Sequence, residues 1–198
     1  IHIHQIARFP AGDQFIIAGL SQLGIKLTGF IEPHFFAGFS GGRKAVLPGI
    51  AGEETIRANH SAAHLSSPMA TFGRLEDNPV HLQMLEAARS VGADFIINVA
   101  TDNQHRITGV FAGDLILAHN AGVRFVRESS MFPLEEACDL AITTNSGYPL
   151  DLNLYQAVKG LAAASQITKP GGSIILAAQC CEGIGGAEFA ALLKEAAS

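Results

Sequence analysis

Hydrophobic runs of strand length alternate along the chain with longer segments whose apolar residues recur at helical spacing. Short apolar runs bounded by Gly, Asp or Pro favour strands, and the longer periodic segments favour helices. Alternation of the two is typical of proteins whose helices connect neighbouring strands of a sheet. The sequence therefore predicts an α/β protein made of two small α/β units, the second resembling part of a doubly wound parallel sheet.

The first unit is expected to span residues 1–128 and to contain most of the predicted elements. Asn78-Pro79 is a helix-start signal, because Asn caps a helix and Pro fits its first turn. Gly, Pro and Asp separate the other elements. The predicted helices lie at 13–23, from about 53 to 60, at 79–91 and at 114–120, and the predicted strands at 25–31, 94–100 and 106–112.

The second unit is expected to span residues 129–198. The polar run Arg-Glu-Ser-Ser, which ends at Ser130, interrupts the pattern and suggests a domain boundary. A short helix should follow, and then a strand at 140–144, a helix at 152–164, a strand at 173–178 and a helix from Ala187. This order of strand, helix, strand and helix resembles half of a doubly wound domain.

A glycine-rich segment separates the strand at 25–31 from the helix that begins near Glu53. It contains five glycines between Gly38 and Gly52, more than an ordinary turn needs. Glycine permits left-handed backbone angles and a close approach of the main chain to a ligand. We expect a loop that exposes N–H donors and that, with the following helix start, could cradle an anion.

Two familiar phosphate-binding motifs do not match this segment. A Walker A loop needs Gly where Arg43 stands, and Ser or Thr where Ala45 follows Lys44. The glycines also lack the spacing of a dinucleotide-binding fingerprint. The sequence therefore indicates something other than a standard nucleoside triphosphatase.

Three residues beside the glycines could carry chemistry. His34 offers an imidazole for acid–base work, Lys44 a nucleophilic amine, and His60 a metal ligand. Each also has an ordinary structural explanation. His34 fits a core or surface histidine at a strand end, Lys44 beside Arg43 fits a pair of solvated cations, and His60 fits a polar helix position.

Composition excludes several other classes of function. The 198 residues carry a net charge of −5 without a basic stripe, so nucleic acid is not an expected partner. No apolar run approaches the roughly 20 residues that a membrane-spanning helix needs. Three cysteines, two of them adjacent, favour a reducing compartment, and we expect a cytoplasmic protein. The chain begins without Met and without a signal peptide, so we expect a preceding portion to be missing.

Several motifs together resemble the nickel-dependent lactate racemases. The string from Glu32 to His60 resembles their signature, in which a histidine, a lysine and a second histidine occur at this spacing. Further blocks are similar to later parts of the same family, so the resemblance extends over nearly the whole chain. These blocks are Asn78-Pro79-Val80-His81, the strand at 94–99, the segment 110–114 with Ala118-His119, and the segment Tyr155 to Lys159.

The resemblance implies a cofactor, the nickel-pincer nucleotide (pyridinium-3,5-bisthiocarboxylic acid mononucleotide nickel). In that family the cofactor is tethered to a lysine through a thioamide, and Lys44 matches this lysine. His60 matches the imidazole that completes square-planar nickel coordination, a geometry suited to Ni(II). The backbone around Gly41 and Gly42 would lie against the cofactor.

The resemblance also implies an isomerase that racemises or epimerises a 2-hydroxy acid by reversible hydride transfer. His34 matches one of two histidines that alternate as base and acid on the substrate hydroxyl. Tyr155, Gln156 and Lys159 match residues that hold the substrate. Gln156 and Lys159 also share one helix face by their spacing, although a solvated polar face explains the pair equally well. Partners would be the small 2-hydroxy acid and the proteins that synthesise the cofactor.

The chain departs from the family pattern at both ends. The family's other catalytic histidine and its substrate-binding arginine precede Ile1, and the second domain looks truncated after Ile184-Gly-Gly, so we expect this fragment to lack full activity. One alternative is a non-catalytic homologue that binds an anion or nucleotide at the glycine-rich segment. Another is an isolated folding module without activity.

Overall fold

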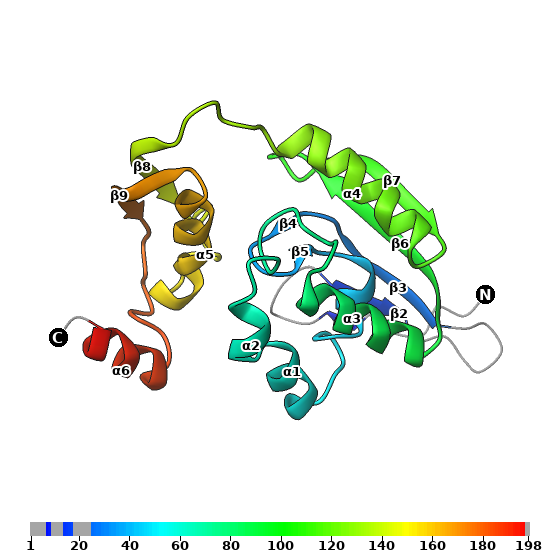
Figure 1. Ribbon diagram of the computed structural model, residues 1–198. Coiled ribbons are helices and arrows are strands. Elements are labelled where there is room, and N and C mark those ends of the chain that lie inside the picture. The colour runs from blue at the N-terminus through cyan, green and yellow to red at the C-terminus, as the bar shows by residue number, and fades with distance from the viewer. Residues whose placement is uncertain (1–6, 9–13, 18–24, 197–198) are drawn as a thin grey trace. The chain divides into compact units, whose positions relative to one another are not determined.

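The computed structural model describes residues 7–8, 14–17 and 25–196, and the chain forms two compact units (Figure 1). The first is Ile1–Phe132 and the second Pro133–Ser198. The boundary lies slightly beyond residue 128, where the sequence pattern placed it, because the last helix of the first unit, α4 (Leu117–Ser130), continues through the polar run.

The first unit is built on a five-stranded sheet with strand order β1-β2-β3-β6-β7. The central pair β3 and β6 is parallel, and the other neighbouring pairs are antiparallel. The strands expected at 25–31, 94–100 and 106–112 are confirmed as β3, β6 and β7. The bounds are β1 Ala7–Arg8, β2 Gln14–Ile17, β3 Ile25–Phe30, β6 Ala93–Thr101 and β7 Ile107–Gly113.

The helix predicted at 13–23 is wrong where the structure describes the chain. Residues 14–17 form β2, which pairs antiparallel with β3 so that Gln14 lies opposite Gly29. The run Phe15-Ile16-Ile17 is aromatic and β-branched, a composition that packs well on a pleated sheet. The other residues of the predicted helix lie outside the described part of the chain.

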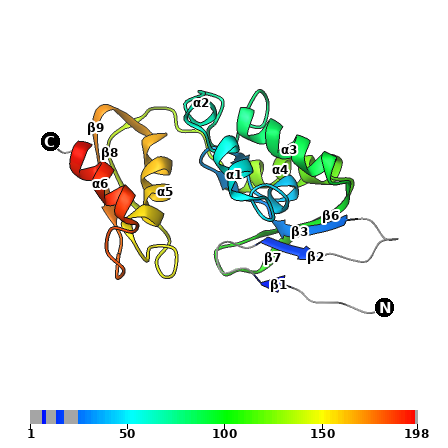
Figure 2. The ribbon, with the colours of Figure 1, turned by 90° about the horizontal axis from the view of Figure 1, so that it is seen from below.

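One face of the sheet carries the helices of this unit. Seen from below, α3 and α4 lie on the same side of β3, β6 and β7 (Figure 2). Strand β6 alternates accordingly, since Ile96 and Asn98 are fully buried whereas Phe95 and Ile97 are exposed. The sequence predicted a buried strand here. In the structure, only the face of β6 that the helices cover is buried.

The glycine-rich segment and its flanks supply the remaining short elements. Helix α3 begins after Asn78, as the start signal predicted. The bounds are β4 Pro33–His34, β5 Gly38–Phe39, the 3-10 helix η1 Gly42–Ala45, α1 Glu53–Asn59, α2 Ala62–Leu65 and α3 Pro79–Ser90.

Helix α4 is longer than the predicted 114–120. It begins after Asp114, whose carboxylate accepts hydrogen bonds from the N–H groups of Ile116 and Leu117, each at 2.8 Å. Val123 and Val126 continue its buried stripe toward the sheet. The helical period therefore extends past the segment that the sequence pattern marked as a break.

Residues 37–47 lie inside the core instead of forming a surface loop. Each of them is buried except Ser40, which is half-buried. The segment contributes to all three hydrophobic clusters of the unit, with Ala45 in the first, Phe39 in the second and Leu47 in the third. The loop expected here is therefore corrected to a buried segment that contains β5 and η1 and packs between the sheet and α3.

The second unit contains a parallel strand pair joined by a helix. Strand β8 (Cys138–Thr144) pairs with β9 (Thr168–Ala177), and α5 (Leu154–Ser165) connects them. Helix α6 (Ala187–Ala196) follows. This βαβ unit agrees with the α/β class. The short helix expected before β8 is wrong, because residues 131–137 form no helix.

No helix in the described ranges is long and apolar enough to cross a membrane.

Asn78 joins three parts of the first unit, so we predict that Asn78→Ala destabilises it. Its fully buried side chain accepts hydrogen bonds from Val80 and His81 at the start of α3 and donates to the carbonyls of Phe36 and Arg74. Losing the cap and leaving buried carbonyls unpaired should cost about 2–3 kcal/mol. Urea unfolding measures this change.

The matched control is Asn120→Ala, since Asn120 is an exposed residue of α4. It should change the free energy of unfolding by no more than about 0.5 kcal/mol. Equal effects of the two substitutions would contradict the structural role of Asn78.

Candidate active site

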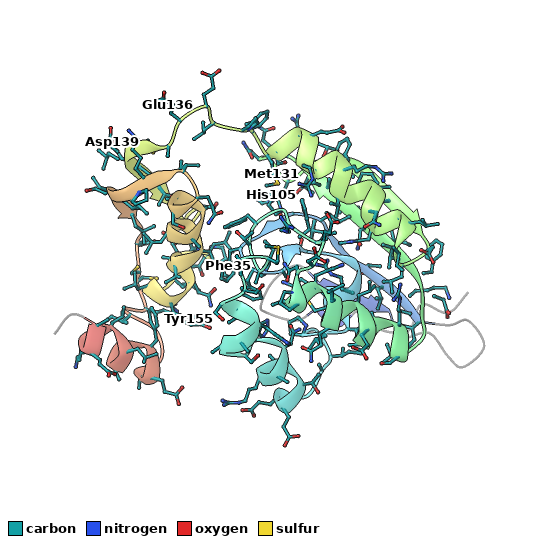
Figure 3. The ribbon with its side chains drawn as sticks, in the orientation of Figure 1. Phe35, His105, Met131, Glu136, Asp139 and Tyr155 are labelled. Carbon is teal, nitrogen blue, oxygen red and sulfur yellow. The ribbon has the colours of Figure 1, made fainter. Side chains whose placement is uncertain are left out.

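The β4–β5 turn fixes the ring of His34. Its Nδ1 accepts hydrogen bonds from the backbone N–H groups of Ala37 at 3.2 Å and Phe36 at 3.5 Å. Both partners are donors, so Nδ1 carries no proton and the neutral ring carries its proton on Nε2. Phe35 lies in the same turn (Figure 3), and its ring stacks on His34 at 4.9 Å between centroids.

Phe36 brings the two sequence-predicted histidines together. Its ring contacts His34 edge-on at 4.6 Å between centroids and contacts His60 in the same manner at 5.0 Å. His60 follows the last residue of α1 as its C-cap. The two imidazoles therefore contact one phenyl ring, although 26 positions separate them in the sequence.

Lys44 lies in η1 and acts electrostatically on His60. Burial lowers the pKa of His60, and the positive charge of Lys44 lowers it further. His34, Lys44 and His60 are thus gathered in one region of the first unit. The neutral form of His60 that this favours is also the form that binds metals.

The explanation of Arg43 and Lys44 as solvated cations is wrong. The side chains are only 1% and 8% exposed, respectively. Burial lowers the pKa of Arg43 to about 9, which leaves it protonated at neutral pH. Two adjacent cations inside the core require partners there, because an uncompensated buried charge is costly.

Gly41 and Gly42 have structural reasons to be glycine. Both have positive φ angles, of 81° and 50°. A Cβ on Gly41 would lie 2.9 Å from the Phe30 carbonyl, and one on Gly42 would lie 3.1 Å from the ring of His119. These glycines let the segment pack against the sheet and α4. Their expected contact with a cofactor stays a prediction.

The anion cradle expected at this segment has little support in the geometry. The N–H of Gly42 donates to Oδ1 of Asn98 at 2.8 Å, so it is used inside the protein. The helix start that follows places Glu53 and Glu54 in the first turn of α1. Two carboxylates there oppose the binding of an anion at that helix terminus.

In the second unit, the structure brings Gln156 and Lys159 together. Nζ of Lys159 donates to Oε1 of Gln156 at 2.8 Å on one face of α5. Desolvation lowers the pKa of Lys159. Tyr155, labelled in Figure 3, is exposed and packs its ring edge-on against Phe189 of α6 at 5.4 Å between centroids. All three residues lie in the first half of α5.

The described residues do not by themselves offer a full set of metal ligands. Within 7–8, 14–17 and 25–196, no group of three or more His, Cys, Asp or Glu side chains could hold a metal ion. His60 offers one neutral imidazole, and Lys44 offers an amine for covalent attachment. This donor set suits a metal that a tethered organic cofactor mainly coordinates and a single imidazole completes.

Comparison with known proteins places these residues in a family. The model of the lactate racemase N-terminal domain matches residues 24–73, and that of the lactate racemase C-terminal domain matches residues 134–198. The lactate racemase of Lactiplantibacillus plantarum is 50% identical over 187 residues, which are 93% of this chain. The chain belongs to the lactate racemase family. It spans 44% of the length of that relative.

Other lactate racemase relatives agree in sequence and fold. The lactate racemase of Thermoanaerobacterium thermosaccharolyticum is 49% identical over 192 residues, covering 96% of this chain and 45% of the relative. A structure of the lactate racemase apoprotein from that organism superposes with a TM-score of 0.82 and 49% identity, covering 86% of this chain and 40% of that one. A Thermotoga maritima protein shares the fold, with a TM-score of 0.62, 22% identity and coverage of 75% and 38%.

Reasoning from the sequence overlooked the residues that hold the site in place. The sequence pattern singled out Arg43 only as a neighbour of Lys44, and His119 only as part of a motif shared with the lactate racemases. Asn98 has no local signal beyond its place in an apolar strand, yet it is fully buried and binds Gly42. A polar residue inside an apolar strand run is the one signal that points to it.

Two buried histidines predict a pH-dependent stability. Burial and the charge of Arg43 lower the pKa values of His81 and His119 to about 3. The unfolded chain takes up these protons near pH 6.5, whereas the folded chain does not until about pH 3. Stability should therefore fall as pH falls from about 6.5, by about 1.4 kcal/mol per imidazole and pH unit. Urea unfolding at pH 7.5 and 5.5 tests this.

The double variant His81→Gln/His119→Gln should lose most of this dependence. The exposed His105→Gln variant removes an imidazole from the surface and serves as its control. An unchanged slope in the double variant would show that other groups govern the acid sensitivity.

Proposed function

We propose that this protein is an isomerase that racemises or epimerises a 2-hydroxy acid, lactate or a larger relative, with a nickel-pincer nucleotide as its cofactor. The contacts of His34 and His60 with Phe36, together with the effect of the Lys44 charge on His60, carry this proposal. The names of the relatives support it, and because this chain spans less than half of their length, the activity belongs to the whole protein.

The chain's own residues suit such a cofactor. Lys44 would attach it through its amine, and His60 would supply the imidazole ligand to nickel. When bound, this group supplies a reversible acceptor for the hydride on C2 of the substrate. Because the Lys44 side chain is buried, a cofactor attached to it would be shielded from bulk water.

His34 would handle the proton of the substrate hydroxyl. Because Nδ1 accepts two backbone hydrogen bonds, the neutral ring carries its proton on Nε2. The Nε2–H group would then donate a hydrogen bond to the oxygen on C2 and stabilise the negative charge that develops there. For His34 to move a proton as acid or base, the Nδ1 contacts would have to rearrange, because a neutral ring that loses its Nε2 proton becomes an imidazolate.

Gln156 and Lys159 would bind the substrate carboxylate or keto oxygen. Their mutual hydrogen bond holds the ammonium group of Lys159 in place, and an ammonium group attracts a carboxylate. Tyr155 would line the same pocket. We also propose a cytoplasmic setting, supported by three free cysteines, and cofactor-synthesising proteins as partners.

Covalent attachment provides the first test. Intact-mass spectra of the protein co-expressed with the cofactor-synthesis proteins should show an adduct, and Lys44→Ala should abolish it and reduce racemisation at least about a thousandfold. Lys169→Ala is the control, because Lys169 forms an exposed pair with Asp139 far along the chain. An adduct that persists in Lys44→Ala would refute the attachment.

Nickel content provides the second test. His60→Ala should lose bound nickel by elemental analysis, because one of the metal's ligands disappears. His64→Ala is the matched control, since His64 is a nearby imidazole that contacts the Asn59 carbonyl. Nickel retained in His60→Ala would contradict the ligand role of His60. A wild type with neither nickel nor racemase activity would favour the alternative of a non-catalytic homologue that binds an anion or nucleotide.

A further inference from the structure

The guanidinium of Arg43 gathers the backbone of the buried segment around itself. Nη2 donates to the carbonyls of Ala37 and Phe39, both at 2.8 Å, and Nη1 lies 3.3 Å from the carbonyls of Ser40 and Gly41. Four backbone carbonyls of residues 37–41 therefore meet one side chain. A buried segment needs such partners, because unpaired backbone polar groups are costly.

No carboxylate balances this charge in the described ranges. The salt bridges found there join exposed side chains, and none of them includes Arg43. The partial negative charges of the carbonyl oxygens take that place. Nε of Arg43 is buried without a hydrogen-bond partner. The arrangement therefore provides donors for the backbone carbonyls of the segment but leaves one N–H of Arg43 itself unpaired.

His119 supports the guanidinium from α4. Its Nε2 lies 2.9 Å from Nη1 of Arg43 and 2.9 Å from the Ser40 carbonyl. Nη1 can only donate and a carbonyl can only accept, so the two contacts require opposite tautomers of the ring. Because Nη1 also reaches the Ser40 carbonyl at 3.3 Å, we assign the proton of His119 to Nδ1, which leaves Nε2 to accept from Arg43. His119 thereby orients Arg43 through a contact between residues 76 positions apart.

Arg43 is also linked to both residues of the proposed chemistry. The N–H of Ala37 holds Nδ1 of His34, and the carbonyl of the same Ala37 accepts from Arg43. Lys44 is the next residue, and its N–H donates to the Gly41 carbonyl that Arg43 also contacts. One guanidinium thus connects the turn that orients His34 with the 3-10 helix that carries Lys44.

We propose that Arg43, oriented by His119, is a positioning residue that fixes Lys44 and His34 relative to each other before any cofactor binds. This inference rests on the proposed function, because fixed positions of Lys44 and His34 matter only if both residues take part in the proposed reaction. It goes beyond that function in naming Arg43 and His119, which touch neither the expected attachment point nor the metal ligand.

The test measures the accessibility of the Lys44 amine in the protein without cofactor. A water-soluble N-hydroxysuccinimide acetate labels lysines, and peptide mass spectrometry gives the rate at Lys44 relative to the exposed Lys169. Release of the segment by Arg43→Met or His119→Leu should raise the relative rate at Lys44 about tenfold, because local opening exposes a buried amine.

The conservative variant separates positioning from bulk packing. His119→Gln offers an amide oxygen that accepts from Arg43 and an amide N–H that can donate to Ser40, so its Lys44 rate should stay within about twofold of wild type. Val126→Ala removes a buried methyl-bearing side chain from the same helix without touching Arg43, and it controls for general destabilisation.

Ring nitrogen shifts of His119 provide a second readout. In the wild type the proton should lie on Nδ1, and in Arg43→Met it should move to Nε2, which can then donate to the Ser40 carbonyl. A wild-type proton on Nε2 would overturn the proposal. So would equal Lys44 rates in His119→Leu, His119→Gln and Val126→Ala. If Arg43→Met does not fold, the comparison of His119→Leu with His119→Gln still tests the proposal.

These measurements need neither nickel nor substrate. Loss of Lys44 protection in His119→Leu, with no adduct in the loaded wild type, would support the positioning role and reject the proposed cofactor. An adduct in the wild type with unchanged Lys44 protection in His119→Leu would support the proposed cofactor and reject the positioning role.

Discussion

The first unit depends on how a buried segment that contains only β5 and the short 3-10 helix η1 satisfies its backbone hydrogen bonds. Residues 37–47 pass through the core between the sheet and α3, where water cannot serve their carbonyls. Arg43 binds four of those carbonyls, and Asn98 binds the N–H of Gly42. With these partners in place, the segment can hold Lys44 inside the protein instead of on its surface.

Electrostatics of the site follow from this burial. Arg43 and Lys44 place two positive charges in the core, and the histidines around them respond by remaining neutral. The pKa values of His60, His81 and His119 are all lowered, in each case first by burial and then by a neighbouring cation. A neutral imidazole can accept a hydrogen bond or bind a metal, so the surrounding charges prepare these rings for both roles.

The glycines serve the same packing. Gly41 and Gly42 adopt left-handed angles at points where a side chain would meet the sheet or His119. Their number first suggested a ligand-binding loop, whereas their immediate reason is close contact between protein elements. In the second unit, by contrast, the pair Gln156 and Lys159 follows from helix spacing alone, since residues three apart share a face.

Local pattern was sufficient for most elements and for the identity of the reactive side chains. The strands at 25–31, 94–100 and 106–112 and the start of α3 follow from apolar period and capping residues. The same signals predicted a helix where β2 forms by pairing with β3. They also predicted too short a helix for α4, whose apolar stripe continues past Asn120. Pairing and packing override local preference at such positions.

By itself, the sequence determined the α/β class and the spacing of His34, Lys44 and His60, because both are properties of short stretches of chain. Only the tertiary structure decided that residues 37–47 are buried, that Phe36 contacts two imidazoles, and that His119 contacts Arg43. Those features arise from contacts between distant segments. They depend on how whole elements pack, which no local period of apolar residues encodes.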